Sequence, residues 1–168
     1  MLPFSNNTLA FSNIIVWRHA EAELADNESR ESDLARSLSS RGQRQAKRMA
    51  RWLKQYLPND TMLLCSPAVR CVQTAEALNY KITLDHALNP TAKLQDILDV
   101  MVSLESSPQN LLLVGHQPWL GQLVTHLTGF SGAELNIKKG AIWWLRQSLN
   151  QTYQYNVISV QVPSFLAK

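Results

Sequence analysis

The chain has 168 residues, of which 45% are hydrophobic and 17% charged, with 6 glycines and 7 prolines. This composition excludes an intrinsically disordered chain and a collagen-like or linker array, and the length fits one domain with a sizeable core. The 16 lysines and arginines exceed the 13 aspartates and glutamates by three. This mild excess favours acidic partners without requiring nucleic acid.

No apolar run approaches the roughly 18 residues of a transmembrane helix. The stretch from Met1 to Asn13 has no lysine or arginine and does not resemble a secretory signal. We therefore expect a cytoplasmic protein with one domain over residues 1–168, of which residues 1–12 form a poorly ordered or loosely packed extension. Cys65 and Cys71 are expected to be reduced, partly buried thiols because they form neither a disulfide framework nor a CxxC pair.

Strands and helices are predicted to alternate along the chain. Short continuous apolar runs, typical of strands buried on both faces, cover residues 13–17, 62–65 and 111–114, and a weaker run covers 81–84. Residues 26–40 have the composition of one long surface loop. Residues 141–145 and 153–160 are predicted as two antiparallel edge strands joined through Asn150-Gln151.

Four helices are predicted between these strands. Ser40 and Gln43 have the spacing of a capping box at the start of a helix that ends near Leu57. Ser66 and Pro67 are predicted as N-cap and first residue of a helix to about Leu78. The other two helices are expected over 91–104 and from Pro118 to Gly129. The alternation predicts an α/β fold, a three-layer α/β/α sandwich whose sheet is mostly parallel with an antiparallel edge.

Cationic residues follow three of the predicted strands. Arg18-His19 follows the first strand, Ser66 to Arg70 the second, and Gly115-His116 the fourth. In an open α/β sheet, ligands bind beyond the carboxyl ends of the strands. A lone histidine after a strand is more often structural, and Arg70 alone would be a solvated charge. Together, however, these groups would be costly to bury without an anion, and a phosphoryl group is the obvious one.

Four motifs carry a family resemblance. They are Arg18-His19-Ala20-Glu21, the turn 38–42 followed by Gln45-Ala46, the run Ser-Pro-x-x-Arg-x-x-Gln-Thr-Ala over 66–75, and Val114-Gly115-His116-Gln117-Pro118. In this order they resemble the histidine phosphatase superfamily, related to phosphoglycerate mutase, and its short SixA-type phosphohistidine phosphatases. The resemblance spans residues 13–160 and implies a domain without a large lid.

The resemblance also implies roles for the site residues. His19 would be the nucleophile that takes the phosphoryl group, and Arg18, Arg70 and His116 would hold its oxygens, with Ser66 also on the substrate. A nucleophilic imidazole must be neutral, with one ring nitrogen free and the N–H of the other held by an acceptor. Neither a cofactor nor a metal is expected.

Two positions depart from the family pattern. Ala20 replaces the glycine of Arg-His-Gly, so the turn after His19 must avoid a positive φ. Asn89 stands where relatives acting on alcohol phosphates carry a glutamate, and an amide cannot protonate a departing alkoxide. Imidazole, with a reference pKa of about 6.5, leaves far more easily. Glu21 is the possible substitute proton donor, whereas Glu23 is expected to be a solvated loop carboxylate.

Three functions follow, in order of preference. The first is a phosphohydrolase that removes phosphate from protein phosphohistidine through a covalent phosphohistidine intermediate. Its partner would be a phosphorylated protein such as a histidine-containing phosphorelay domain, with phosphate in the active site, no membrane association and no expected nucleic acid. The second is a phosphatase for small phosphate esters or anhydrides. The third, a non-catalytic anion- or nucleic-acid-binding module, rests on the basic stripe Arg44, Lys47, Arg48, Arg51 and Lys54, which is more simply a solvated helix face.

The tryptophans are the last ambiguous feature. Trp119, Trp143 and Trp144 either line a pocket or fill the core. Because neighbouring residues of a strand point to opposite faces, at least one of the adjacent pair is expected in the core.

Overall fold

The computed structural model describes residues 9, 11–104, 109–131, 134–149 and 155–166. The strands are β1 (Asn13–Arg18), β2 (Thr61–Cys65), β3 (Ile82–Leu84), β4 (Asn110–Gly115), β5 (Ile142–Gln147) and β6 (Tyr155–Gln161). The helices are α1 (Arg30–Ala35), α2 (Ser40–Tyr56), α3 (Val69–Glu76), α4 (Leu94–Ser103) and α5 (Trp119–Thr128), with a 3₁₀ turn η1 at His86–Leu88.

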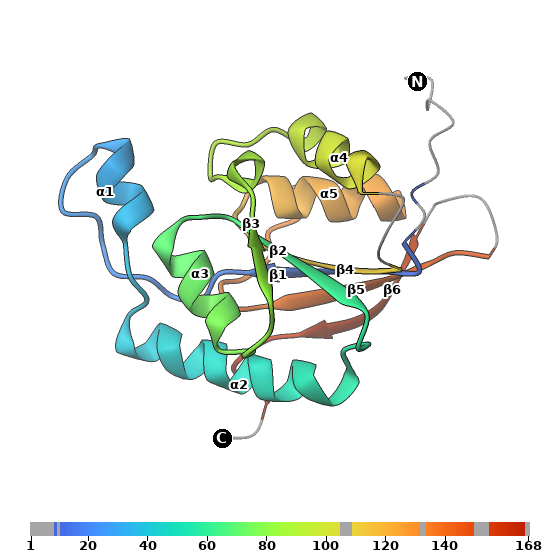
Figure 1. Cartoon of the computed structure of the whole chain (residues 1–168), viewed down its shortest axis with the longest axis horizontal. Coiled ribbons are helices and arrows are strands. Elements are labelled where there is room, and N and C mark those ends of the chain that lie inside the picture. The colour runs from blue at the N-terminus through green and yellow to red at the C-terminus, as the bar shows by residue number, and fades with distance from the viewer. Residues whose placement is uncertain (1–8, 10, 105–108, 132–133, 150–154, 167–168) are drawn as a thin grey trace.

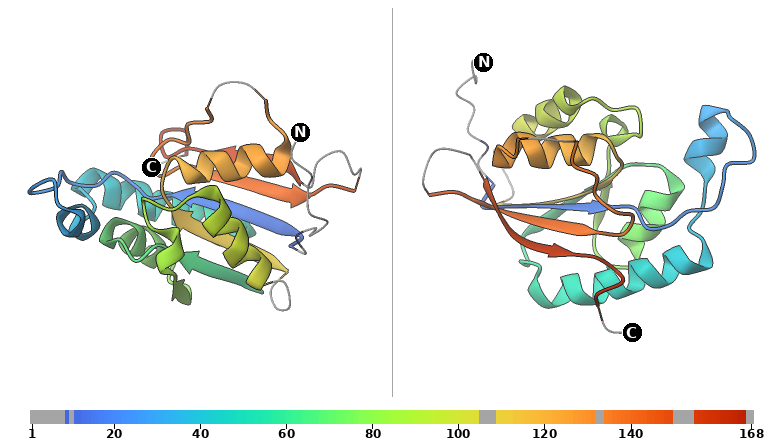
Figure 2. Two further views of the ribbon diagram at one scale, coloured as in Figure 1. Left: turned by 90° about the horizontal axis from the view of Figure 1, so that it is seen from above. Right: turned by 180° about the vertical axis from the view of Figure 1, so that it is seen from behind.

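The six strands form one sheet in the order β3-β2-β4-β1-β5-β6. The first four are mutually parallel, whereas β5 runs antiparallel to β1, and β6 antiparallel to β5. Helices α4 and α5 cover one face of the sheet, and α2 and α3 cover the other (Figures 1 and 2). The predicted three-layer α/β fold with an antiparallel edge is confirmed.

Alternating side chains of the central strands divide the core into two halves. Ile14 and Val16 of β1 pack in the cluster under α4 and α5, while Ile15 and Trp17 pack against α2 and α3. Trp144 belongs to the second half, and its neighbour Trp143 packs against the first. Because Trp144 is buried, the expectation that at least one of this adjacent pair lies in the core is confirmed. Trp119 of α5 is also buried.

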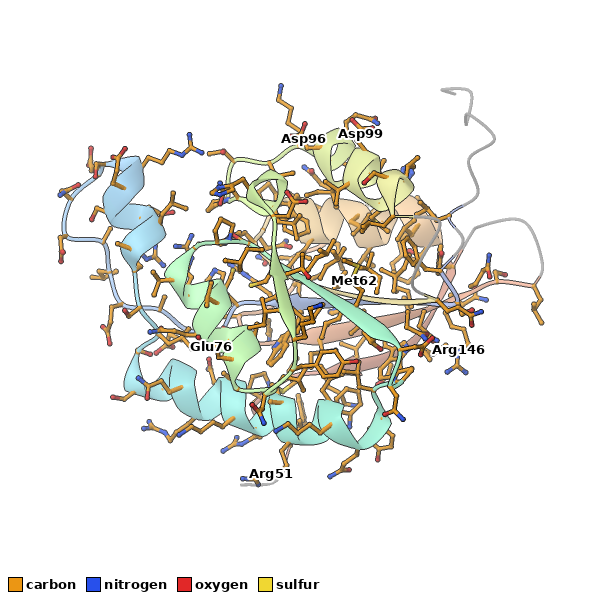
Figure 3. All side chains as sticks on the ribbon, in the orientation of Figure 1. Arg51, Met62, Glu76, Asp96, Asp99 and Arg146 are labelled. Atoms are coloured by element: carbon orange, nitrogen blue, oxygen red, sulfur yellow. The ribbon has the colours of Figure 1, made fainter. Side chains whose placement is uncertain are left out.

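Charged side chains lie outside these layers. Arg51 on α2 and Asp99 on α4 point away from the sheet (Figure 3). Of the basic stripe, Arg44, Lys47, Arg51 and Lys54 are exposed. Arg48 is half-buried and donates to the backbone oxygen of Pro163 at 2.7 Å. The stripe is therefore a solvent-exposed helix face, except that Arg48 bonds to the backbone of the chain's last segment.

One helix was not predicted. Residues 26–40, expected to be a long loop, contain α1, which Ser29 caps by accepting from the Ser32 N–H at 3.1 Å. None of the six residues of α1 is buried. A helix without a buried face has no apolar periodicity, which is the signal on which helix prediction depends.

Several helix starts differ from the prediction by one to three residues. Ser39, not Ser40, caps α2, accepting from the Gly42 N–H at 3.0 Å. The helix predicted at Ser66-Pro67 begins only at Val69, with Ala68 as its N-cap, while Ser66 Oγ accepts from the Ala68 N–H at 3.3 Å. Helix α4 starts at Leu94 rather than 91, and α5 starts at Trp119, one residue after Pro118. Gly129 ends α5 with a φ of 70°, as expected.

The residues before β1 differ from the prediction as well. Leu9 and Phe11 are buried in the core, and the Tyr155 hydroxyl donates to the Phe11 oxygen at 2.7 Å. For these two residues the expectation of a loosely packed extension is wrong, since apolar side chains at this position close the end of the sheet. Residues 1–8 and 10 lie outside the described residues, as do Asn150-Gln151 and the predicted start of the last strand at 153.

Candidate active site

The backbone around His19 is fixed by the two strands next to β1. The His19 N–H donates to the Gly115 oxygen at the end of β4 at 3.1 Å. The N–H of Gly140, just before β5, donates to the His19 oxygen at 3.0 Å. Gly140 has a φ of 77°, a conformation that favours glycine. The sheet therefore holds His19 at its carboxyl edge, next to the end of β4.

The His19 ring is held neutral with a free nitrogen. Its Nδ1 lies 2.7 Å from the Ala20 oxygen, and since a carbonyl only accepts, Nδ1 must carry the proton. Nε2 therefore keeps its lone pair. Burial lowers the pKa of His19 to about 3, aided by the charges of Arg70, Arg18 and Arg36 and opposed by the Ala20 hydrogen bond. These are the properties that the sequence argument required of a nucleophile.

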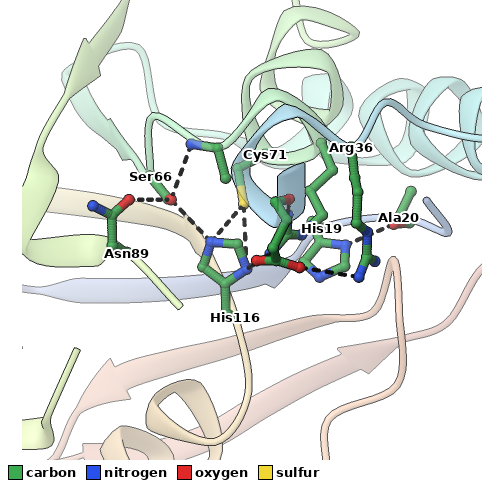
Figure 4. A network of polar contacts seen from close by, with 10 residues as sticks. His19, Ala20, Arg36, Ser66, Cys71, Asn89 and His116 are labelled. Carbon is green, nitrogen blue, oxygen red and sulfur yellow. Dashed lines mark hydrogen bonds and ion pairs between the residues drawn. The ribbon is translucent and has the colours of Figure 1, made fainter. Parts of the chain in front are cut away.

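His116 faces His19 from the loop after β4. The two ring centroids are 5.2 Å apart, and His116 Nε2 lies 2.9 Å from Ser66 Oγ (Figure 4). Burial, followed by the charges of His19 and the nearby arginines, lowers the pKa of His116 to about 2. Gly115 precedes this loop because a Cβ there would overlap the Trp119 ring.

Arg70 and Arg18 lie against the two histidines. Arg70 is 3% exposed, and its NH2 lies 3.4 Å from His116 Nδ1. The guanidinium is held by Asp33 of α1, through the backbone oxygen at 2.5 Å and the carboxylate at 3.0 Å. Arg18 donates to the Ile137 oxygen at 2.6 Å. The four predicted residues Arg18, His19, Arg70 and His116 are thus brought to one edge of the sheet.

Two further residues escaped sequence reasoning. Asp33 holds Arg70, and Arg36 lies near enough to both histidines for its charge to lower their pKa values. Asp33 and Arg36 also pair with each other at 3.1 Å. The available signal was an oppositely charged pair three residues apart, directly before the turn 38–42. It lay inside the segment interpreted as a loop.

The guanidinium groups of the site have buried Nε atoms that are not paired within the described part of the chain. The Nε atoms of Arg18, Arg36 and Arg70 are buried and have no hydrogen-bond partner among the described residues. A buried donor without an acceptor costs free energy, more so on a charged group. A cavity of about 370 Å³ opens beside Arg18, lined also by Gln117, Pro118, Glu134 and Asn136. The arrangement is that of an anion site with an adjoining space.

Glu21 is not brought to the two histidines. Its carboxylate accepts from Ser39 Oγ at 2.9 Å and pairs with Arg41 at 3.5 Å, at the start of α2. Glu23 is exposed, as expected for a loop carboxylate. In contrast, Asn89 is 6% exposed and lies at the site, with Oδ1 3.5 Å from Ser66 Oγ. Asn89, which the sequence assigns to the acid position of ester phosphatases, is therefore brought next to Ser66 and carries an amide there.

Ala20, which stands where the family pattern has glycine, causes no backbone strain. Asn79 is the only non-glycine residue with a positive φ in the described ranges, so Ala20 avoids that region. The Ala20 N–H instead donates to Thr74 Oγ1 at 3.0 Å. The turn after His19 is thereby tied to α3.

The remaining features of interest are the two cysteines, groups of possible metal ligands and long apolar helices. Cys65 and Cys71 are free, buried thiols, as expected, and burial raises the pKa of Cys71 to about 12. Within the described residues, no three His, Cys, Asp or Glu side chains are grouped so as to hold a metal ion. Nor does this part of the chain contain a helix with the length and hydropathy needed to cross a membrane.

Known proteins support the assignment from the motifs. Residues 14–98 match the model of the histidine phosphatase superfamily, branch 1. The chain belongs to this superfamily. It is SixA-like: it is 30% identical over 131 residues to a phosphohistidine phosphatase SixA homolog from Haemophilus influenzae, covering 70% of this chain and 77% of that protein.

Solved structures show the same fold. A SixA protein histidine phosphatase complexed with tungstate is similar with a TM-score of 0.74 and 23% identity, covering 90% of this chain and 97% of that one. A phosphohistidine phosphatase SixA from Agrobacterium tumefaciens, so assigned provisionally, gives 0.76 and 22%, covering 90% and 99%. The fold of these structures therefore extends along nearly the whole chain.

Proposed function

We propose that this protein removes phosphate from phosphohistidine in a partner protein through a covalent intermediate on His19. The observation that supports it most is the His19 ring, whose Nδ1–H donates to the Ala20 oxygen while Nε2 stays unprotonated. Such a nitrogen attacks phosphorus in line, and water then hydrolyses the N–P bond to release inorganic phosphate.

The cations around His19 supply the electrostatic part of catalysis. Arg18, Arg70 and His116 bind the three equatorial oxygens, with Arg36 as an additional positive charge. The buried Nε atoms of Arg18, Arg36 and Arg70 have no partner among the described residues, which supports their role as donors to an anion. Positioning and charge stabilisation account for most of the catalysis of phosphoryl transfer, so this set is sufficient. Tungstate bound to the SixA structure is a tetrahedral oxyanion of the same kind.

The leaving group decides the class of substrate. Asn89 cannot donate a proton as an acid, and the Glu21 carboxylate is engaged by Ser39 and Arg41. An alkoxide would leave without protonation, whereas imidazole, with a pKa near ~6.5 for its conjugate acid, leaves far more readily. This contrast favours phosphohistidine over alkyl phosphates and agrees with the phosphohistidine phosphatase name of the Haemophilus relative.

The experiment uses a phosphohistidine-containing phosphorelay domain, phosphoramidate and an alkyl phosphate with wild-type protein and His19→Ala. We expect fast turnover of the first two substrates, slow turnover of the third, and phosphate on His19 in acid-free quenched samples by mass spectrometry. His19→Ala should lose turnover yet still bind phosphate through Arg18 and Arg70. Equal rates on the alkyl phosphate, or a tenth of wild-type activity in the variant, would show the proposal to be wrong.

A further inference from the structure

A chain of buried polar contacts runs from Arg70 to Asn89 through the second histidine. Arg70 NH2 lies 3.4 Å from His116 Nδ1, His116 Nε2 lies 2.9 Å from Ser66 Oγ, and Ser66 Oγ lies 3.5 Å from Asn89 Oδ1 (Figure 4). Ser66, Asn89 and His116 are 0%, 6% and 2% exposed. Because these groups are almost closed to solvent, they hydrogen-bond mainly with one another.

The two ends of the chain fix the direction of every hydrogen bond. A guanidinium only donates, so His116 Nδ1 must accept and its proton must be on Nε2. An amide oxygen only accepts, so Ser66 must donate its single proton to Asn89. The Ser66 oxygen then accepts from His116 Nε2–H and from the Ala68 N–H, 3.3 Å away. Both ends favour this tautomer, and the contact of the ring with Ser66, at 2.9 Å, is shorter than its contact with Arg70, at 3.4 Å.

We propose that Asn89 is a positioning residue of this site, which acts through Ser66 to hold the His116 proton on Nε2 and to leave Nδ1 on the side of Arg70, where the anion would bind. The position that gives ester phosphatases their acid would thus serve the second histidine here. This inference rests on the proposed function in that the anion is the phosphoryl group.

The arrangement couples anion binding to one proton. A phosphate or sulfate oxygen beside Nδ1 needs a donor, and Ser66 already holds the Nε2 proton. One proton from the solvent must therefore bind to Nδ1, which gives up its hydrogen bond from Arg70 NH2, so that both Arg70 and Nδ1–H donate to the anion. His116 then becomes an imidazolium that donates from both nitrogens. Without the anion the ring stays neutral, because burial, His19 and the three arginines lower its pKa. A dianion between these groups offsets most of their positive charge and favours the imidazolium.

Few groups face His116 and could affect its protonation. They are His19 directly after β1, Ser66 after β2, Arg70 and Cys71 from α3, and the charges of Arg18 and Arg36. Cys71 Sγ lies 3.4 Å from Nε2, but a thiol is a weak partner and burial keeps it protonated. Ser66 is therefore the group that decides the tautomer.

The test is ¹⁵N NMR of the histidine rings, with sulfate as the probe because it stays dianionic at neutral pH. In wild-type protein without sulfate, His116 should show a protonated Nε2 and an unprotonated Nδ1, and saturating sulfate should protonate both. In Asn89→Ala, Ser66 loses its acceptor and can donate to Nε2. Because this contact, at 2.9 Å, is shorter than the Arg70 contact, at 3.4 Å, the proton should shift to Nδ1 and the hydrogen bond from Arg70 should be lost. Asn89→Asp keeps an acceptor and should keep the wild-type tautomer.

Asn110→Ala is the matched control, since it makes the same change at a buried asparagine at the other end of β4. It should leave the His116 signals unchanged. A proton on Nδ1 in the wild type, or an unchanged Nε2–H in Asn89→Ala, would overturn the proposal. The spectra need no turnover, so failure of the tautomer assignment is distinct from failure to hydrolyse phosphohistidine.

Discussion

The two ends of the β1–β4 pair are both polar, yet they are built differently. At the amino end, Asn13 pairs in register with Asn110 and donates to its side chain at 2.6 Å. Asn110 in turn donates to Asp60 at 2.8 Å, and Trp144 Nε1 donates to Asn13 at 2.9 Å. At the carboxyl end, buried arginines keep donors without partners among the described residues.

The difference separates polar groups that serve the fold from those that serve a ligand. A closed network of amides satisfies itself, and its value is stability and register. A set of buried cations with free donors is costly to the fold unless an anion completes it. Substitutions at the amino end should therefore change stability, and those at the carboxyl end activity.

The largest effect is expected for Arg70→Ala. Removing a donor that stabilises transition-state charge typically lowers kcat by about 10²–10³-fold. Arg70→Lys should recover only part of this, because a lysine cannot reproduce the guanidinium fork. The measurement is steady-state hydrolysis of phosphoramidate. Arg146→Ala is the control at the opposite end, where Arg146 Nε donates to Asn13 at 3.2 Å, and it should leave kcat unchanged.

The second effect concerns stability at low pH. The pKa values of His19 and His116 are lowered to about 3 and about 2, from a reference value of 6.5. Below pH 6.5 the unfolded chain binds more protons than the folded one, so the stability that these neutral rings provide is lost as pH falls toward 3. Each ring contributes a slope of at most about 1.4 kcal/mol per pH unit.

Urea denaturation between pH 7 and pH 4 tests this slope. His19→Ala and His116→Ala should each make the free energy of unfolding less sensitive to pH in that range. The matched control is His86→Ala, which changes an exposed histidine in η1. An unchanged slope in the two site variants would mean that these rings are not held neutral in the folded protein.

The third effect should appear in stability alone. Asn110→Ala removes both contacts of a buried amide and leaves Asp60 and Asn13 without this partner. We expect the free energy of unfolding to fall by about 1–3 kcal/mol. Phosphoramidate turnover at a temperature well below unfolding should be unchanged. Loss of activity in the folded variant would break the separation between the two ends.

Sequence reasoning placed the sheet and the four principal site residues because both have strong local signals. Apolar runs such as 111–114 predict buried strands, and the carboxyl ends of parallel strands meet at one edge. Arg18, His19 and His116 stand at or directly after the ends of such strands, and Arg70 lies in the first turn of the helix that follows β2. Ser66 was assigned to the site but also to a helix cap, since a serine before proline is equally compatible with both.

What escaped prediction depends on long-range or polar contacts. Helix α1 has no buried residue, so nothing in its pattern distinguishes it from a loop. Its contribution to the site arises from Asp33 meeting Arg70, 37 positions further along the chain. The burial of Leu9 and Phe11 likewise depends on packing against strands distant in sequence. Local propensity carries no information about such contacts.

Arg36 gives the smallest effect and tests the missed helix. Its side chain is 22% exposed, and its charge lies near both histidines without the direct ring contact that Arg70 makes. Its Nε is one of the buried donors without a partner in the described ranges. We expect Arg36→Ala to lower kcat/KM for phosphoramidate by about tenfold, equivalent to roughly 1.4 kcal/mol. Most of this should be in KM if the residue binds the ground-state anion as well as the transition state.

The control for Arg36 is Arg48→Ala, which removes a half-buried arginine whose contact is the Pro163 oxygen. It should leave kcat/KM unchanged while lowering stability slightly. The surface ion pair between Arg36 and Asp33 contributes little to folding, so Arg36→Ala should unfold at the wild-type urea concentration. If Arg36→Ala keeps wild-type kinetics, the anion site ends at Arg18 and Arg70, and the role of α1 is confined to Asp33 holding Arg70. If it loses tenfold, the carboxyl end of the sheet recruits its third arginine from the C-cap of a helix that the apolar pattern of the sequence does not reveal.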